Sequence, residues 1–555
     1  MMSTEVALQQ SEELLARYAK GTARPEPNRL DLNIDASDLI AAITALRGAR
    51  WGYLAALTGV DLGVEANQIE ALYHICEGDA VATLRVRVPR AGGAVPSVYA
   101  LYPNAMFFER ELAEMFGVTV TGLADTSHLF LPDGWPEKTY PLLKDTDVQA
   151  AAAHVKGSEP PEPGRQGDRF IVPIGPQHPA LKEPGHFEFS VDGELVTGAT
   201  VRLGYVHRGI ERACEQQNYT QNLYLTERVC GICSHSHATA YVNGVEKLAK
   251  VEAPPRAQAI RQLVACLERI HSHFLWLGVA AYEAGFETLL MYSWRDREIV
   301  MDILEQMTGN RVNYSASVLG GVKFDVTSAN ADAIRRGMVK IEERTKHYLH
   351  VVTTDSSFLA RARGIGVTSK DEADSLGLLG PTLRAAGVPR DIRVDAPYGS
   401  YKQFPVTPSV DSAGDLAARF KVRMLETLES VRVIRAILDG LPEGDLTVKF
   451  PRKIPAGEAI SRFEAPRGEL FYYIKSNGTD KPERVKIRTP SICNWIFVLK
   501  KAVGAQLADV PPLLAGIDPC FSCNDRTIVI NRPRHGRQVL TWEELRRQAI
   551  THTRR

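Results

Sequence analysis

Two short stretches, ERVCGICSHSH at residues 227–237 and DPCFSCNDR at residues 518–526, each carry a Cys-x-x-Cys pair. The first pair is Cys230 and Cys233, and the second is Cys520 and Cys523. Four thiolates from segments so far apart can meet only if the fold between them brings them together. Thiolates are soft ligands that suit zinc, iron–sulfur clusters, nickel or copper(I). The sequence therefore predicts a buried metal site with soft ligands.

A structural zinc ribbon is the simplest alternative for this site. Zinc ribbons usually close their two cysteine pairs over about 15–20 residues, whereas nearly the whole C-terminal half of this chain separates the pairs. The spacing disfavours a ribbon, but a long-range four-cysteine zinc site remains open on spacing alone. The other cysteines stand alone and are interpreted as buried structural thiols in a reducing compartment: Cys76, Cys214, Cys266 and Cys493.

Composition and charge exclude several classes of protein. The chain has 555 residues, 44% of them hydrophobic, with 66 basic and 66 acidic residues, so no excess charge argues for nucleic acid or an anionic membrane. The N-terminal segment lacks the basic and apolar regions of a signal peptide. No run reaches the roughly 18 apolar residues that span a bilayer. Any membrane association must therefore come through partner subunits.

The chain divides at residues 149–169, which are rich in Ala, Pro and Gly and read as a linker. We expect an α+β module at residues 1–148, with a helix that begins near Asp35 and strands at 69–76 and 80–90. A second helix, at 107–117, places apolar residues on one face. Its charged residues are expected to face solvent or a partner: Glu109, Arg110, Glu111 and Glu114.

Residues 170–526 are predicted to form a mostly helical domain with peripheral antiparallel sheet, which makes the whole chain α+β. Apolar residues keep helical spacing at 256–285, and 329–354 and 414–440 behave in the same way. Hairpins are predicted at Asp192-Gly193 and within 470–488. Residues 527–555 form a separate, arginine-rich tail.

Five ordered motifs carry a specific resemblance. Besides the two cysteine motifs, the chain has RGIE at 208–211, EAPRGE at 464–469 and TPS at 489–491. Together they resemble the [NiFe] hydrogenase large subunit, in the order and approximate spacing of that family. Residues 175–194 and 217–241 are similar to the group related to respiratory complex I, both to the formate hydrogenlyase large subunit and to the forty-nine-kilodalton subunit of complex I. Residues 107–145 resemble the thirty-kilodalton subunit of complex I.

The resemblance implies a role for each matching residue. Cys230 and Cys520 would be terminal nickel ligands, and Cys233 and Cys523 would bridge nickel to an iron that carries CO and cyanide. Dihydrogen would be split heterolytically there, with Cys520 as the first proton acceptor. Glu211 would be a proton-relay carboxylate. Arg467 would place its guanidinium above the metals and either donate to cyanide or act as a base. Ser491 would donate to a second cyanide, and His237 would lie beside the ligands. On the sequence alone, His237 fits a core histidine equally well.

Two positions depart from a simple match. Many hydrogenases end the last motif with a histidine that binds an extra Mg or Fe ion; here that position is Arg526, which cannot ligate a cation, so the extra ion is left open. The family further implies a precursor that an endopeptidase cuts between Arg526 and Thr527. His178 in the GPQHP loop corresponds to a quinone-site loop of complex I, but a turn between strands explains the loop as well, so His178 receives no role.

The resemblance also implies partners. An iron–sulfur small subunit similar to the twenty-kilodalton-type subunit of complex I would hold [4Fe-4S] clusters, because this chain has no spare clustered cysteines. Ferredoxin-like subunits and antiporter-like membrane subunits would hold the chain peripherally at the cytoplasmic face of the membrane. Two alternatives remain: a complex I-like quinone-reducing subunit, and a non-catalytic scaffold with zinc. The direction of hydrogen chemistry, the electron carrier and ion pumping are not encoded in this chain.

Overall fold

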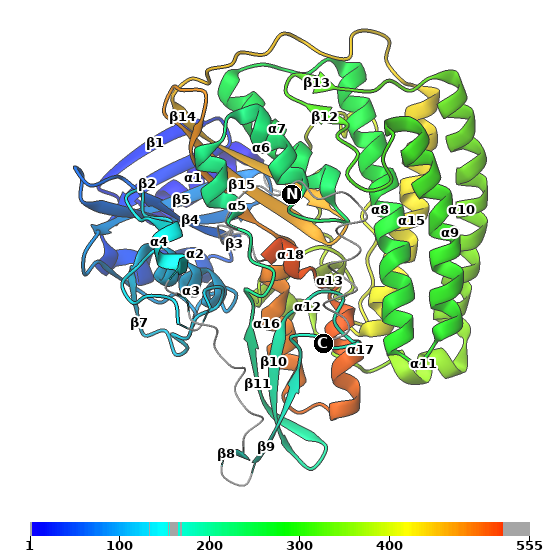
Figure 1. The fold of residues 1–555 in the computed structure, drawn as a ribbon, viewed down its shortest axis with the longest axis horizontal. Helices are drawn as coiled ribbons and strands as arrows, with labels where there is room; N and C mark the ends of the chain where they lie inside the picture. The colour runs from blue at the N-terminus through cyan, green and yellow to red at the C-terminus, as the bar shows by residue number, and fades with distance from the viewer. Residues whose placement is uncertain (1–2, 133, 154, 156–164, 167–168, 525–555) are drawn as a thin grey trace, which may run out of the picture.

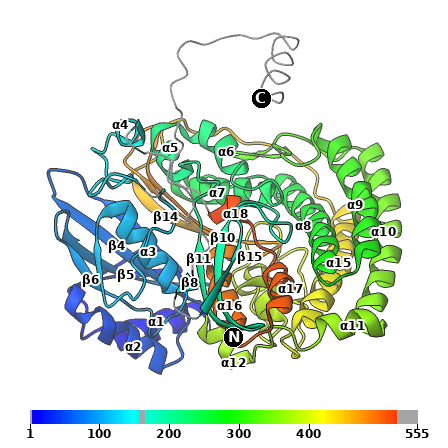
Figure 2. The same ribbon diagram turned by 60° about the horizontal axis from the view of Figure 1, so that its bottom comes forward.

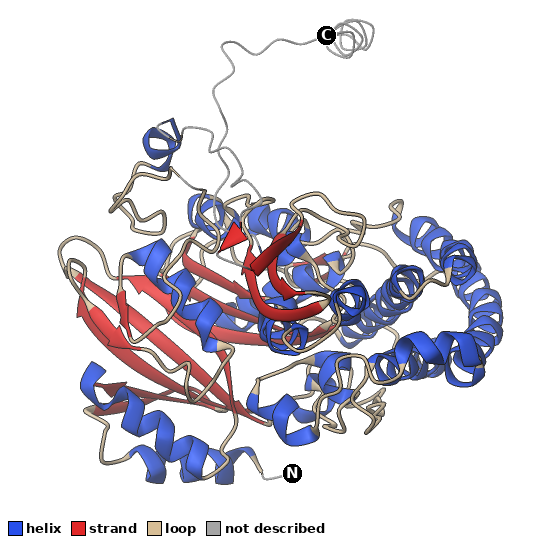
Figure 3. Ribbon diagram, turned by 90° about the horizontal axis from the view of Figure 1, so that it is seen from below, coloured by secondary structure: helices blue, strands red, loops and turns tan. Residues whose placement is uncertain are grey.

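The computed structural model describes residues 3–132, 134–153, 155, 165–166 and 169–524. Three regions lie side by side (Figures 1 and 2): an N-terminal module of sheet and short helices, a central three-stranded sheet, and a group of long helices. Figure 3 shows the strands gathered on one side of the molecule and the long helices on the other. The predicted α+β class is confirmed.

The N-terminal module is built on a five-stranded sheet in the order β1-β2-β5-β4-β3. Only β2 and β5 pair in parallel; the other neighbours are antiparallel. The elements are α1 (Thr4–Leu15), β1 (Gly21–Glu26), β2 (Arg29–Ile34), α2 (Leu39–Gly48), β3 (Tyr53–Asp61), β4 (Gln68–Glu77), β5 (Ala80–Pro89), β6 (Ala94–Pro96), α3 (Ala105–Phe116), β7 (Thr119–Thr121) and α4 (Val148–Ala153). Both predicted strands, at 69–76 and 80–90, are present as β4 and β5.

The expectation that the charged residues of α3 face solvent or a partner is wrong, because all four are buried and bound within the chain. Glu109 accepts hydrogen bonds from Val98 N–H and the Ser97 hydroxyl. Glu114 accepts from two successive backbone N–H groups. The other two residues form ion pairs, Arg110 with Asp125 and Glu111 with Lys486. The helical periodicity correctly predicted the apolar face of α3, but it could not predict contacts with residues outside the helix.

Two local predictions need smaller corrections. Asp35 precedes a short 3-10 turn at Ala36–Asp38 rather than α2 itself, and its side chain makes no capping hydrogen bond. The predicted hairpin is present, but Asp192 pairs with Leu195, so the turn residues are Gly193 and Glu194 rather than Asp192 and Gly193.

The hairpin belongs to a four-stranded antiparallel sheet in the order β11-β10-β9-β8, which projects from the body of the molecule (Figure 1). Its strands are β8 (Arg165–Gln166), β9 (Arg169–Ile174), β10 (His186–Asp192) and β11 (Leu195–Arg202). The GPQHP segment lies in the loop between β9 and β10, and a cis peptide bond joins Gly175 and Pro176 there.

The helical part contains four long helices that pack against one another: α8 (Pro255–Glu283), α9 (Glu287–Thr308), α10 (Ser328–Thr354) and α15 (Leu416–Asp439). Shorter elements fill the remaining space: α5 (Ile210–Gln216), α6 (Tyr219–Glu227), α7 (Ser234–Ala249), β12 (Ser317–Val318), β13 (Gly321–Val322), α11 (Ser356–Ala362), α12 (Lys370–Ser375), α13 (Gly380–Arg384), α14 (Ile392–Asp395), α16 (Pro490–Ala502), α17 (Val510–Gly516) and α18 (Phe521–Asn524). In the described part of the chain, none of the helices combines the length and apolar character that crossing a bilayer requires.

The third sheet, β14 (Gly457–Ala465), β15 (Gly468–Ser476) and β16 (Pro482–Arg488), contains the second predicted hairpin. It is largely buried between the N-terminal module and the helices, whereas the β8–β11 sheet is peripheral (Figure 1). Charged groups cross the boundary with the N-terminal module. Glu458 of β14 accepts hydrogen bonds from Arg29 and Arg85, and Lys486 of β16 pairs with Glu111.

The predicted processing position between Arg526 and Thr527 and the basic tail lie outside the described residues, as does most of the predicted linker.

Replacing Glu458 with Gln tests how strongly the boundary between the N-terminal module and the central sheet depends on charge. Burial raises the pKa of the Glu458 carboxyl, but Arg85 and Arg29 lower it overall to about 2. Because the folded-state pKa lies below the unfolded value, the carboxylate stabilises the fold above about pH 4.5 and loses this effect as the pH falls toward about 2. We expect Glu458→Gln to lower the free energy of unfolding by about 2–3 kcal/mol at pH 7.

The measurement is denaturant unfolding at several pH values, with Asp35→Asn as the control, because Asp35 forms an exposed pair with Lys20. The control should have no measurable effect. The difference between wild type and Glu458→Gln should shrink below about pH 4.5; a difference independent of pH would contradict the electrostatic explanation.

Candidate metal centre

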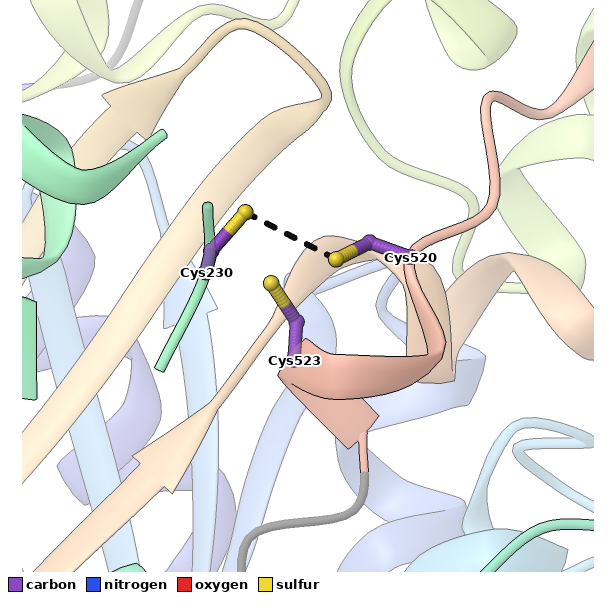
Figure 4. Close-up of side chains that lie close together, drawn as sticks. All are labelled: Cys230, Cys520 and Cys523. Atoms are coloured by element: carbon purple, nitrogen blue, oxygen red, sulfur yellow. Dashed lines mark hydrogen bonds between the residues drawn. The ribbon is translucent and has the colours of Figure 1, made fainter. Parts of the chain in front are cut away.

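The fold brings the two Cys-x-x-Cys pairs together. Cys230 lies in the loop before α7 and Cys233 directly precedes that helix, while Cys520 and Cys523 lie immediately before and within α18. All four are buried. The sulfur atoms of Cys230 and Cys520 are 3.6 Å apart, and Figure 4 shows the side chain of Cys523 pointing toward the same space.

The four thiols and His237 form two overlapping groups that could each hold a metal ion. Cys230, Cys520 and Cys523 form one group, and Cys233, His237 and Cys523 form the other; within each, the potential ligand atoms lie within 4.8 Å of one another. Cys523 belongs to both groups. The arrangement therefore suits two neighbouring metal ions that share the Cys523 thiolate as well as it suits one ion.

Backbone N–H groups already point at the first sulfur. Ile232 N–H and Cys233 N–H donate to Cys230 Sγ at 3.3 Å and 3.2 Å. Burial raises the pKa of the Cys230 thiol, but hydrogen bonds from the other three thiols lower it overall. The hydrogen bonds to Cys230 raise the pKa of Cys233 and of Cys520. Burial, together with the hydrogen bonds to the other cysteines, raises the pKa of Cys523. Four thiolates in one buried space therefore need cations to compensate their charge.

Arg467 supplies one such cation. It lies in the turn between β14 and β15, and its Nη1 is 3.9 Å from Cys233 Sγ and 4.0 Å from Cys230 Sγ. Its Nε donates to the backbone oxygen of Asp518 at 2.8 Å, and its Nη2 pairs with the carboxylate at 3.1 Å. Burial lowers the pKa of Arg467, but Asp518 and the cysteines raise it overall to well above its usual range. Of the two predicted roles, this favours the donor over the base.

Ser491 and His237 also contact the cysteines. Ser491, in the first turn of α16, accepts a hydrogen bond from Cys520 N–H at 3.3 Å, which leaves its own hydroxyl proton able to donate. His237 Nε2 lies 3.6 Å from Cys523 Sγ, and its Nδ1 is 2.7 Å from the Tyr472 hydroxyl. Both side chains are buried, so their orientation is set by these contacts.

Glu211 is fully buried in the first turn of α5. Its carboxylate accepts from Arg484 Nη2 at 2.8 Å and from Ile487 N–H at 3.0 Å, and Lys486 Nζ lies 3.8 Å away. The resemblance implied a proton-relay carboxylate at this position. The structure shows that the carboxylate is buried, and the two cations of β16 are partners that the sequence pattern did not reveal.

Several residues that sequence reasoning left without a role hold the second cysteine motif in place. Arg208 donates to the backbone oxygens of Val229 and Ser522 at 2.8 Å and 2.9 Å, and so ties the first motif to the second. From the β9–β10 loop, Lys182 pairs with Asp518 at 3.0 Å, and Glu183 accepts from Ser522 N–H at 2.9 Å. The sequence signal that could have identified Lys182 and Glu183 was their position as two adjacent, oppositely charged residues in a Pro/Gly-rich loop.

His178 lies in the same loop and takes part in its turn. Its Nδ1 accepts the Ala180 N–H at 3.1 Å, and its backbone oxygen accepts the Leu181 N–H at 2.9 Å. The loop lines a cavity of about 460 Å³. These contacts support the interpretation of GPQHP as a turn.

Three protein families match parts of the chain. The respiratory-chain NADH dehydrogenase 30 Kd subunit matches residues 32–152, the 49 Kd subunit matches 283–454 and 450–526, and nickel-dependent hydrogenase matches 208–278. The hydrogenase match therefore covers the RGIE motif and the first cysteine pair.

Relatives that cover most of the chain agree with these matches. Formate hydrogenlyase subunit 5 of Escherichia coli is 33% identical over 532 residues, which cover 94% of this chain and 93% of the relative. The membrane-bound hydrogenase subunit alpha of Pyrococcus furiosus is 39% identical over 400 residues, covering 69% of this chain and 93% of the relative. NADH-quinone oxidoreductase subunits are also among the relatives.

Among solved structures, a chain of an archaeal membrane-bound sulfane sulfur reductase is 32% identical with a TM-score of 0.63, covering 65% of this chain and all of that one. This chain, however, combines both complex I-type domains with a match to nickel-dependent hydrogenase. It belongs to the family of complex I-related [NiFe] hydrogenase large subunits in which a 30 kDa-type and a 49 kDa-type domain are fused.

Proposed function

We propose that this chain is the catalytic large subunit of a membrane-associated [NiFe] hydrogenase that splits or forms dihydrogen and passes electrons to an iron–sulfur partner. The convergence of four buried cysteines beneath a permanently charged guanidinium carries the proposal. Sulfur-rich donors with one shared cysteine fit a nickel–iron pair. When bound, such a centre would supply the redox chemistry and the polarisation of dihydrogen.

Each protein group has a task in this proposal. Cys230, Cys233, Cys520 and Cys523 would hold the nickel–iron pair, and Cys523 is the cysteine that both groups of potential ligands share. Arg467 is held over the cysteines by Asp518, so it is positioned to donate to a diatomic ligand such as cyanide, and Ser491 can donate from α16. His237 orients Cys523 from the side of α7.

Proton movement is assigned to Cys520 and Glu211. A thiolate of the cluster is the first acceptor, and Glu211 takes the proton onward. Glu211 is suited to this because it is buried on α5 and its carboxylate is oriented by Ile487 N–H. Arg484 Nη2 pairs with the carboxylate at 2.8 Å, and this ion pair stabilises the ionised form that accepts the proton.

The partners and location follow from the family. Two of the relatives are subunits of complexes that are named as membrane-bound. We propose that this chain is bound peripherally at the cytoplasmic face of the membrane. Electrons would leave to a small subunit of the twenty-kilodalton type that carries [4Fe-4S] clusters, with ferredoxin-like and antiporter-like subunits beyond it. A maturation endopeptidase would cut after Arg526. Quinone reduction at the GPQHP loop is less well supported, because His178 Nδ1 is used in the turn.

Metal content of the purified complex and of Cys523→Ser tests the central assignment. We expect about one nickel per chain in the wild type, and more iron than the [4Fe-4S] clusters of the partner subunits hold. The variant should lose nickel and all hydrogen-dependent dye reduction, because its sulfur would serve both metals. Cys266→Ser is the matched control: Cys266 is also buried, on α8, and burial raises the pKa of its thiol to about 11. Zinc in the wild type, or activity in Cys523→Ser, would contradict the proposal.

Replacing Arg467 with Lys tests the guanidinium. An ammonium cannot donate at the same time to the Asp518 backbone oxygen, to its carboxylate and toward the cysteines, because it lacks the planar fork. We expect dye reduction to fall about 10–100-fold while nickel content is retained. Wild-type activity in Arg467→Lys would show that positive charge alone suffices.

Replacing Glu211 with Gln tests the proton relay. The amide retains an oxygen for Ile487 N–H but cannot carry a proton, so we expect hydrogen-dependent dye reduction to fall about 10²–10⁴-fold with nickel retained. Glu109→Gln is the control, because Glu109 is a buried carboxyl of α3 that accepts hydrogen bonds from the Ser97 hydroxyl and Val98 N–H and has no place in the proposed relay. Unchanged turnover in Glu211→Gln would exclude Glu211 from the relay.

A further inference from the structure

A second carboxylate on α5 continues the line that Glu211 begins. Glu215 follows Glu211 by four residues on the same helix, so their side chains project from the same face. The proposed function assigns no role to Glu215, and a relay that ended at the fully buried Glu211 would have no route to solvent.

One guanidinium holds both carboxylates. Arg484 Nη2 binds Glu211 Oε2 at 2.8 Å, and Arg484 Nη1 lies 3.7 Å from Glu215 Oε1. Adjacent nitrogen atoms of one planar group therefore place the two carboxylates close together. Burial lowers the pKa of Arg484, but the two carboxylates raise it overall, so the guanidinium stays charged and does not itself carry the proton.

Glu215 lies nearer the surface than Glu211. Its side chain is 10% exposed, against 0% for Glu211. Arg212, also on α5, binds Glu215 Oε2 at 3.1 Å, and its other terminal nitrogen donates to the backbone oxygen of Lys144 at an exposed position. Glu215 is thus positioned between the buried carboxylate and the protein surface.

The groups that surround Glu215 suit repeated proton uptake and release. The charged groups that act on it are Glu211 and Arg212 from α5 and Arg484 from β16. Burial raises the pKa of Glu215, the two arginines lower it, and the result is about 7. A carboxyl group that titrates near neutral pH exchanges protons efficiently in both directions.

We propose that Glu215 is the second proton carrier of this enzyme and connects Glu211 to solvent. This inference rests on the proposed function, in which Glu211 receives the proton. In the outward step, protonated Glu211 gives its proton to the Glu215 carboxylate, directly or through one water molecule. Glu211 becomes ionised, Glu215 becomes neutral, and Glu215 then releases the proton to solvent beside Arg212. No electron moves in this step, and the reverse order delivers protons inward.

The competing explanation is that Glu215 only fastens α5 to β16 through Arg484. Both explanations predict a defect on substitution, so the test needs a measurement that a purely structural role would not change. Exchange between D2 and solvent protons meets this need, because it requires protons to cross the protein but requires no electron acceptor.

The experiment measures D2–H2O exchange, hydrogen-dependent dye reduction and nickel content of the intact complex in membranes. The variants are Glu215→Gln, Glu215→Asp, Arg212→Gln and the control Glu109→Gln, whose buried carboxyl also has a pKa raised by burial to about 7. We expect Glu215→Gln to slow exchange at least tenfold with nickel retained. Glu215→Asp should recover most of the rate, and the control should match the wild type.

Arg212→Gln supplies a test that is independent of folding defects in Glu215→Gln. Arg212 lowers the pKa of Glu215, so its removal should raise that pKa. Hydrogen oxidation needs ionised Glu215 as the acceptor, and its rate should rise with pH through about 7 in the wild type. In Arg212→Gln this rise should move to higher pH.

Wild-type exchange in Glu215→Gln, or an unmoved pH profile in Arg212→Gln, would overturn the proposal. If Glu215→Gln loses nickel, the Arg212→Gln profile and recovery by Glu215→Asp decide the matter. Slow exchange in Glu211→Gln together with normal exchange in Glu215→Gln would reject Glu215 while leaving the hydrogenase assignment intact. Normal exchange in both Glu211→Gln and Glu215→Gln would instead reject the relay through α5 as a whole.

Discussion

The buried ion pair between Arg467 and Asp518 is the interaction on which the metal site depends. Both side chains are almost completely removed from water, and each would be costly to bury alone. Arg467 comes from the turn of the central sheet, whereas Asp518 lies two residues before Cys520 and has a left-handed backbone conformation. The pair therefore fixes the distance between the sheet and that motif, and Lys182 adds a third element to the same carboxylate.

Paired charges also join the N-terminal module to the rest of the chain. Glu458 binds two arginines of the module, and Lys486 lies between Glu111 of the module and Glu211 of α5. A boundary made of hydrogen-bonded charges specifies one relative position, because a shifted module would leave charges buried without partners. The module thus reaches the surroundings of the proposed proton relay, although it contributes none of the four cysteines.

The sequence allowed the fold class, most long helices and the meeting of the four cysteines to be predicted, because each rests on a local signal. Apolar periodicity marks helices such as 256–285, and cysteine spacing marks ligands. Contacts between distant charges leave no such trace. Glu109, Arg110, Glu111 and Glu114 resembled the polar face of a surface helix, and only the packed structure shows their partners. Arg484 and Lys486 alternate along β16 as residues of an exposed strand would, yet both are buried beside Glu211.

The contacts around residues 518–523 have a consequence for the order in which the site is completed during synthesis. Lys182, Glu183, Arg208 and Arg467 all find partners in this one short segment. The ribosome makes the segment after all four of them, so until the segment docks, these charged side chains lack the partners that it provides. When residues 518–523 dock, these four charged side chains gain their partners in the segment together. A chain that ends before residue 518 lacks the segment and cannot form the site. The cysteine cluster therefore cannot close before residues 518–523 have been synthesised.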